Sequence, residues 1–146
     1  MTNEVLLVED ERKTGEMLRD ALQSEGISVN WAMDGPTALE KLNKSSPDLI
    51  ILDLKLPGMT GDEVLERIRA VDKFVDVIVY TNYQDPPVMQ KLINLGVEGY
   101  ISKGAEADLW ETVEKVKRLL DPFTEEETED LLRTLPKDVF DGLKSK

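Results

Sequence analysis

Five short apolar runs alternate with amphipathic stretches, and this alternation constrains the fold more than any other feature of the chain. The expected strands are residues 4–8, 27–32, 48–53, 76–81 and 97–101. Three of them contain uninterrupted apolar runs (VLLV, LIIL and VIV), which are typical of strands covered on both faces of a parallel sheet. The second run, ISVNWA, is more polar and is expected at an edge of the sheet.

The intervening stretches have helical periodicity. The clearest one places Leu109, Val113, Val116 and Leu120 on one helix face. Strict alternation of strands and helices predicts an α/β fold, with right-handed crossovers and helices on both faces of a parallel sheet. Five such strands fit the flavodoxin-like order 2-1-3-4-5.

The alternation stops after Leu120. We therefore predict one domain over residues 1–120 and an acidic helical C-terminal extension or linker over residues 121–146. This tail has 8 acidic and 4 basic residues and contains a capping-box pattern, Thr124-x-x-Glu127.

The chain has no cysteine and no histidine, which excludes many kinds of site. Disulfides, thiol nucleophiles, Cys/His zinc sites and catalytic triads with an imidazole base cannot be built from it. Its 30 acidic and 18 basic residues give a net charge of −12, which disfavours direct contact with nucleic acid. The N-terminus lacks the pattern of a secretory signal and no apolar run is long enough to cross a bilayer, so we expect a cytoplasmic protein.

Chemically capable residues stand where the predicted strands end. Glu9 and Asp10 follow the first strand, Asp53 ends the third, Thr81 ends the fourth, and Lys103 follows the fifth. The predicted strand order brings these ends to one edge of the sheet, where α/β folds bind their ligands. Each residue alone has a structural explanation, such as a helix cap or a solvated loop lysine, but their convergence favours a site.

Crowded carboxylates repel one another, and a hard divalent cation such as Mg²⁺ relieves that repulsion. Asp53 could then act as a covalent nucleophile toward a phosphoryl group. The Lys103 ammonium and the Thr81 hydroxyl could bind the phosphoryl oxygens.

With these residues assembled, the chain resembles the receiver domains of two-component response regulators over about residues 2–120. The matching stretches are LLVEDE at 6–11, IILDLKLPGMTGDE at 50–63, VIVYTN at 77–82 and GYISK at 99–103. The resemblance implies a signalling switch, rather than an enzyme in the ordinary sense, that promotes its own phosphorylation and dephosphorylation. Asp53 would accept phosphate from the phosphohistidine of a sensor histidine kinase or phosphotransfer protein.

The resemblance also implies roles for other residues. Asp10, Asp53 and the backbone carbonyl of Lys55 would ligate Mg²⁺, with Glu9 acting through water. Thr81 and Tyr100 match the paired switch positions that alter the surface of the fourth helix, fifth strand and fifth helix.

Two positions depart from the family pattern. Gly104 stands where most members have a proline, so we expect a trans bond and a looser loop after Lys103. Asn82 stands where most members have a smaller residue, and we expect it either to narrow access to the phosphoryl group or to alter the rate of its hydrolysis.

The resemblance leaves the output open. A downstream protein would be the partner of a single-domain regulator, whereas a receiver cut from a longer chain would act on a missing output domain. Neither membrane binding nor direct binding of nucleic acid is expected, and a homodimer is compatible with the sequence.

Three alternatives remain open. A pseudo-receiver would use the same surface as a protein-interaction adaptor without being phosphorylated. A phosphatase with an aspartyl intermediate would need a second acid two residues after the nucleophile, and Lys55 stands there. A flavin-binding module would need a turn after the first strand that is rich in glycine and hydroxyls, and the turn here is acidic.

Overall fold

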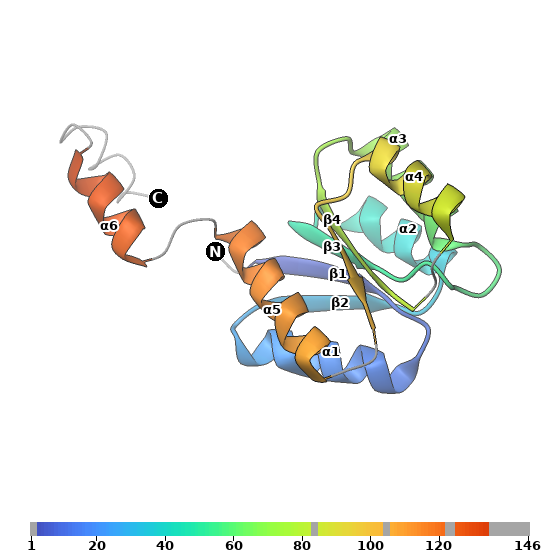
Figure 1. Ribbon diagram of the computed structural model, residues 1–146, viewed down its shortest axis with the longest axis horizontal. Coiled ribbons are helices and arrows are strands. Elements are labelled where there is room, and N and C mark those ends of the chain that lie inside the picture. Colours follow the sequence, from blue (N-terminus) through green and yellow to red (C-terminus); the bar gives the residue numbers. More distant parts are fainter. Residues whose placement is uncertain (1–2, 83–84, 104–105, 122–124, 135–146) are drawn as a thin grey trace.

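The computed structural model of the chain describes residues 3–82, 85–103, 106–121 and 125–134. Strands and helices alternate within these residues as predicted (Figure 1). In chain order the elements are β1 (Glu4–Val8), α1 (Arg12–Ser24), β2 (Ser28–Ala32), α2 (Gly35–Lys44), β3 (Leu49–Leu52), α3 (Gly61–Val71), β4 (Asp76–Thr81), α4 (Pro86–Leu95), β5 (Gly99–Ser102), α5 (Glu106–Leu120) and α6 (Glu125–Thr134).

The five strands form one parallel sheet in the order β2-β1-β3-β4-β5, which confirms the predicted flavodoxin-like order. β2, the more polar run, lies at one edge and exposes or half-buries most of its side chains. The bounds of β1 and β4 match the prediction, and those of β2, β3 and β5 differ from it by one or two residues. In particular, β3 ends at Leu52, so Asp53 lies just beyond the strand.

Helices cover both faces of the sheet, with α1 and α5 on one face and α2, α3 and α4 on the other (Figure 1). Successive side chains of a strand point to opposite faces. Leu6, Val8, Ile50 and Leu52 therefore pack under α2, α3 and α4, whereas Val5, Leu7, Leu49 and Ile51 pack under α1 and α5. The three central strands are consequently buried along nearly their whole length.

α3 and α4 are attached to the molecule in different ways. α3 buries Val64, Leu65 and Ile68, whereas Leu92 is the one buried residue of α4. Polar contacts join the two helices along their length. Lys91 Nζ of α4 lies 2.8 Å from Asp62 Oδ2 of α3 and also pairs with Glu66.

Arg69 of α3 adds contacts at the C-terminal end of α4. Its guanidinium donates to the carbonyl oxygens of Leu95 (3.0 Å) and Gly96 (2.7 Å) at that end. It also donates to those of Asp72 (3.2 Å) and Val75 (2.8 Å), in the segment that leads into β4. One side chain thus connects the end of α4 with the turn after α3.

α5 ends at Leu120, where the predicted alternation stops. α6 begins at Glu125, but Thr124 of the predicted capping box lies outside the described residues. The division into domains at residue 120 therefore stays a prediction. Among the residues that the structure describes, no helix combines the length and the apolar composition needed to cross a membrane.

Candidate functional site

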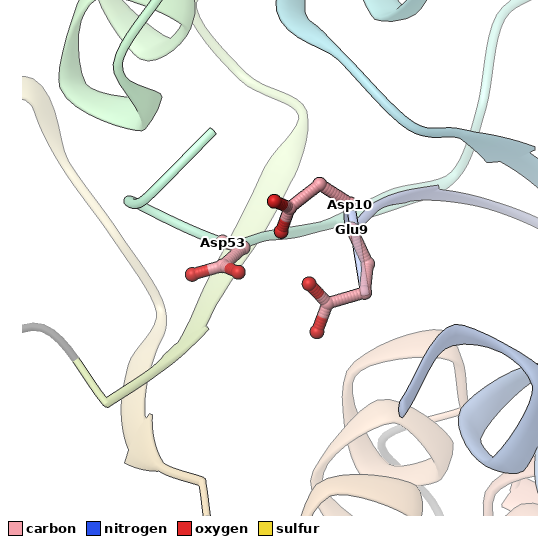
Figure 2. Close-up of side chains that lie close together, drawn as sticks. All are labelled: Glu9, Asp10 and Asp53. Atoms are coloured by element: carbon pink, nitrogen blue, oxygen red, sulfur yellow. The ribbon is translucent and has the colours of Figure 1, made fainter. Parts of the chain in front are cut away.

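Three carboxylates meet beyond the carboxyl ends of β1 and β3. Oxygen atoms of Glu9, Asp10 and Asp53 all lie within 4.8 Å of one another, and the side chains converge in Figure 2. Glu9 is 1% exposed and Asp53 is 4% exposed, whereas Asp10 is open to solvent. Burying charged groups is costly unless they are paired or bind a metal, so this cluster needs a compensating cation.

The backbone hydrogen bonds of the sheet continue past the strand ends and position the site. Glu9 N–H donates to the Ala32 carbonyl (3.0 Å) on β2, and Asp53 N–H donates to the Val8 carbonyl (3.0 Å) on β1. On the other side of the site, Lys103 N–H donates to the Thr81 carbonyl (3.1 Å). Each of these residues is therefore held in register with the strand beside it.

Close packing at Gly61 fixes the loop after Asp53. A Cβ atom on Gly61 would lie 2.3 Å from the Asp53 carbonyl oxygen and 2.5 Å from Leu54 Cα, so no larger residue fits. Gly61 N–H donates to the Leu54 carbonyl (2.8 Å), and Lys55 N–H donates to Asp53 Oδ1 (3.2 Å). The glycine of the PGMTG segment thus lets α3 begin directly against the backbone of Asp53.

Lys103 supplies the compensating positive charge. Its Nζ lies 2.7 Å from Asp53 Oδ2 and 2.5 Å from Glu9 Oε1, and its side chain is 10% exposed. The ammonium also lies 5.9 Å from the centroid of the Tyr80 ring. The sequence predicted that Lys103 would be near the acids. The structure adds that it bridges two of them.

Burial and hydrogen bonding shift the pKa values of the two buried acids, Glu9 and Asp53, in opposite directions. Burial, reinforced by the hydrogen bond with Asp53, raises the pKa of Glu9 to about 8. Burial also favours neutral Asp53, but hydrogen bonds from Glu9, Lys103 and Thr81 outweigh it and hold the pKa of Asp53 below its usual value. Near neutral pH, Asp53 is therefore ionised while Glu9 retains a proton. Lys103 stays charged, because its contacts with both acids outweigh burial and raise its pKa.

The donor set fits a hard divalent cation. Its ligating atoms are carboxylate oxygens, which Mg²⁺ prefers. Glu9 Oε1 is buried and, despite its proximity to Lys103, lacks a partner with hydrogen-bond geometry. A cation that paired with these oxygens would relieve both the repulsion and the unsatisfied acceptor.

An open pocket of about 430 Å³ lies over these acids. Its lining contains most of the site residues predicted from the sequence: Asp10, Asp53, Lys55, Thr81 and Lys103. Glu11 and Asn82 also line it. Thr81 is fully buried at the end of β4, whereas Asn82 is exposed at the rim. The predicted convergence of Asp10, Asp53, Thr81 and Lys103 is therefore present as a physical cavity.

Two predicted site residues that the structure describes, Glu9 and Tyr100, are not among those that line the pocket. Tyr100 of β5 is half-buried against the apolar cluster beneath α4, and burial raises the pKa of its hydroxyl. Gly104 lies outside the described residues. The roles assigned to Tyr100 and to the Lys55 carbonyl remain predictions, as does the effect of Gly104.

Sequence reasoning missed one residue at this site. Trp31 Nε1 on β2 donates a hydrogen bond to the Glu9 carbonyl oxygen (2.9 Å). A tryptophan in the edge strand was visible in the sequence, but no motif indicated that its side chain would reach across to the acidic turn.

Known proteins are similar to this chain along most of its length. Residues 5–114 match the response regulator receiver domain family. Sporulation initiation phosphotransferase F of Bacillus subtilis is 32% identical over 82% of this chain and 95% of its own length. Transcriptional activator protein IrlR of Burkholderia pseudomallei is 39% identical over 80% of this chain, which spans about half (49%) of that relative.

Solved structures share the fold. A CheY-like receiver domain protein from Methanospirillum hungatei superimposes with a TM-score of 0.78 at 26% identity, covering 89% of this chain and 99% of its own. The chemotaxis response regulator CheY4 of Vibrio cholerae superimposes with a TM-score of 0.71 at 31% identity, covering 80% of this chain and 99% of its own.

Proposed function

The chain belongs to the response regulator receiver domain family, and from this membership we propose that it is a phosphoacceptor switch of a two-component system. Asp53 accepts a phosphoryl group from the phosphohistidine of a sensor histidine kinase or a phosphotransfer protein. Receiver domains are signalling domains rather than classical enzymes, and the chemistry proposed here is a single transfer onto the protein itself.

One observation carries this proposal. Asp53 is a buried, ionised carboxylate that contacts the Lys103 ammonium and the Thr81 hydroxyl while it lines an open pocket. A buried ion pair with a purely structural role needs no access to solvent, whereas a nucleophile does. The combination of burial, ionisation and access favours a reactive group.

In the proposed reaction, an Asp53 carboxylate oxygen attacks phosphorus and the phosphorus–nitrogen bond of the donor breaks. The electron pair of that bond returns to the imidazole, and Asp53 becomes an aspartyl phosphate. The lowered pKa of Asp53 keeps the nucleophile ionised without a general base. Such transfer depends chiefly on positioning and charge neutralisation, and this set of residues supplies both.

Other residues of the pocket would stabilise the transferred group. Asp10, Asp53 and the Lys55 carbonyl would hold Mg²⁺, with Glu9 acting through water, and the bound ion would neutralise phosphoryl oxygens. Lys103 would exchange a carboxylate for a phosphoryl oxygen, and Thr81 would donate its hydroxyl to another. These steps use the residues that already contact Asp53 in the resting protein.

The conformational change after phosphorylation would pass from Thr81 to Tyr100. Movement of the Thr81 hydroxyl toward the phosphoryl group would let the Tyr100 ring move inward beneath α4. The surface formed by α4, β5 and α5 would change as a result, and a downstream protein or an output domain would bind it.

Mass spectrometry tests the proposal. The protein is incubated with acetyl phosphate and Mg²⁺, and we expect a single phosphoryl adduct in its intact mass. Asp53→Asn should abolish the adduct, whereas Asp48→Asn, which changes an acid at the opposite end of β3, should retain it. Absence of an adduct on the unmodified protein would instead support the pseudo-receiver, and rapid turnover of a phosphomonoester would support a phosphatase.

A further inference from the structure

We propose that Trp31 is a positioning residue for the cation site, acting through the backbone of Glu9. This inference rests on the proposed function, because it concerns the same pocket. Trp31 lies on the edge strand β2 and pairs in register with Leu7 of β1, two residues before Glu9. Its indole N–H donates to the Glu9 carbonyl oxygen over 2.9 Å.

Every backbone polar group of Glu9 is thereby bonded to β2. The N–H of Glu9 donates to the Ala32 carbonyl, and its carbonyl accepts from Trp31. The peptide group between Glu9 and Asp10 is planar, so a hydrogen bond to its carbonyl oxygen restrains the orientation of the whole plane. That plane sets the direction in which the chain reaches the Asp10 Cα atom. The hydrogen bond from the indole therefore restrains the backbone from which the exposed Asp10 side chain projects.

α1 holds the indole in place. A Cβ atom on Gly15 would lie 2.0 Å from Trp31 Cζ2 and 2.4 Å from Cε2, so the ring occupies the space that any larger residue would need. Arg19, one helical turn later, places its guanidinium carbon 5.7 Å from the ring centroid. The ring is thus packed against the helix that begins just after the acidic turn, and a rotation of the indole would require that helix to move.

The side chain of Glu9 is oriented from the same turn. Glu11 N–H donates to Glu9 Oε2 (3.3 Å), while Oε1 faces Lys103. Trp31 therefore fixes the backbone from which both acids of the turn project. Groups that orient metal ligands contribute to affinity although they never touch the ion.

Calorimetric titration of Mg²⁺ into the full chain tests this role. Trp31→Phe keeps an aromatic ring but removes the N–H donor, and we expect about tenfold weaker Mg²⁺ binding, at the lower end of the losses seen when supporting groups are removed. Gly15→Ala keeps the indole but displaces it, so we expect a loss of similar size.

Val29→Ala is the matched control. Val29 lies on the same strand two residues earlier and is likewise half-buried against the cluster beneath α1. Its truncation should lower the urea midpoint without altering Mg²⁺ affinity. Equal Mg²⁺ affinity in Trp31→Phe and the unmodified protein would overturn the inference. So would an equal loss of affinity in Val29→Ala, since that would trace the effect to general destabilisation.

The two proposals fail in different ways. If the unmodified protein does not bind Mg²⁺, the cation site itself is absent, and both the proposed function and the role of Trp31 are contradicted. If the unmodified protein binds Mg²⁺ and forms the phosphoryl adduct while Trp31→Phe binds equally well, the proposed function stands and only the role of Trp31 is contradicted.

Discussion

α3 and α4 lie side by side on one face of the sheet and each follows a strand that contributes to the site, yet they are secured by different forces. α3 follows Asp53, begins against its backbone at Gly61 and buries three large apolar side chains. α4 follows Thr81 and fully buries Leu92 alone, while Val88 and Leu95 are only partly buried against the same cluster. Much of its attachment is polar and passes through Lys91 and through Arg69 of α3.

This difference indicates which part of the molecule can move at low cost. A helix with three buried apolar residues shifts only if packed side chains separate, whereas a helix held by hydrogen bonds and ion pairs can exchange these for contacts with water. We therefore expect the acids to keep their positions when the site changes its ligand, while α4 changes position or stability. The expected moving element is the one that carries part of the proposed output surface.

Arg69→Ala should have the largest effect among the variants that test this comparison. It removes the donor to carbonyls at the end of α4 and in the turn after α3, and hydrogen bonds from a charged group contribute about 2 kcal/mol. We expect a loss of about that size in urea unfolding. In native-state hydrogen exchange, the amides of α4 should lose more protection than those of α3.

Arg67→Ala is the control for this variant, because it removes the same type of side chain from an exposed position of α3. It should leave the exchange of α4 nearly unchanged. If α4 amides keep the same protection as α3 amides after Arg69→Ala, then α4 is held by its apolar contacts and the comparison is wrong.

The pH dependence of stability should show that ionising buried Glu9, one of the acids that we expect to keep its position, destabilises the folded protein. In metal-free protein the pKa of Glu9 is raised to about 8, so between about pH 5 and pH 8 the folded protein holds a proton that the unfolded chain has released. Stability should therefore fall as pH rises through this window. The slope should be up to about 1.4 kcal/mol per pH unit for a full proton.

Glu9→Gln should flatten this slope in urea titrations at several pH values, and Glu11→Gln, an exposed change in the same turn, should retain it. Saturating Mg²⁺ should also diminish the slope, because binding the cation favours ionised Glu9. An undiminished slope in Glu9→Gln would mean that another group holds the proton.

Lys91→Gln should have the smallest effect on stability, since Lys91 and its two partners, Asp62 and Glu66, all reach solvent. Burial favours neutral Asp62, but the hydrogen bond from Lys91 outweighs it and lowers the pKa of Asp62. The pair therefore stabilises the fold above the unfolded pKa of Asp62, and this contribution disappears as pH falls through the folded pKa. A small drop in the urea midpoint at pH 7 should vanish at low pH and shrink in 1 M NaCl. An equal drop under all three conditions would exclude an ionic cause.

Much of the fold followed from the sequence because buried parallel strands leave a clear apolar pattern. The edge position of β2 and the strand order were predicted in this way and are confirmed. The meeting of Asp53, Thr81 and Lys103 also followed, since strand order alone determines which strand ends are neighbours.

Contacts between side chain and backbone were not predictable in the same way. Trp31 reaches Glu9 and Arg69 reaches Gly96 through hydrogen bonds to carbonyl oxygens, and a carbonyl is present at every position of the chain. Periodicity and motif spacing carry no information about which carbonyl is chosen. The bridge from Lys103 to both acids likewise depends on the path of a flexible side chain, which strand order does not specify.

The position of the Lys103 ammonium has a consequence for which ions can compete at the pocket. It is a monovalent cation tethered between Glu9 and Asp53, so it cannot diffuse away when the solution is diluted. Sodium or potassium would bring no more charge than the ammonium already provides and would have to lose water to enter. A doubly charged ion gains more from the same oxygens, so the site should select ions by valence before it selects them by size.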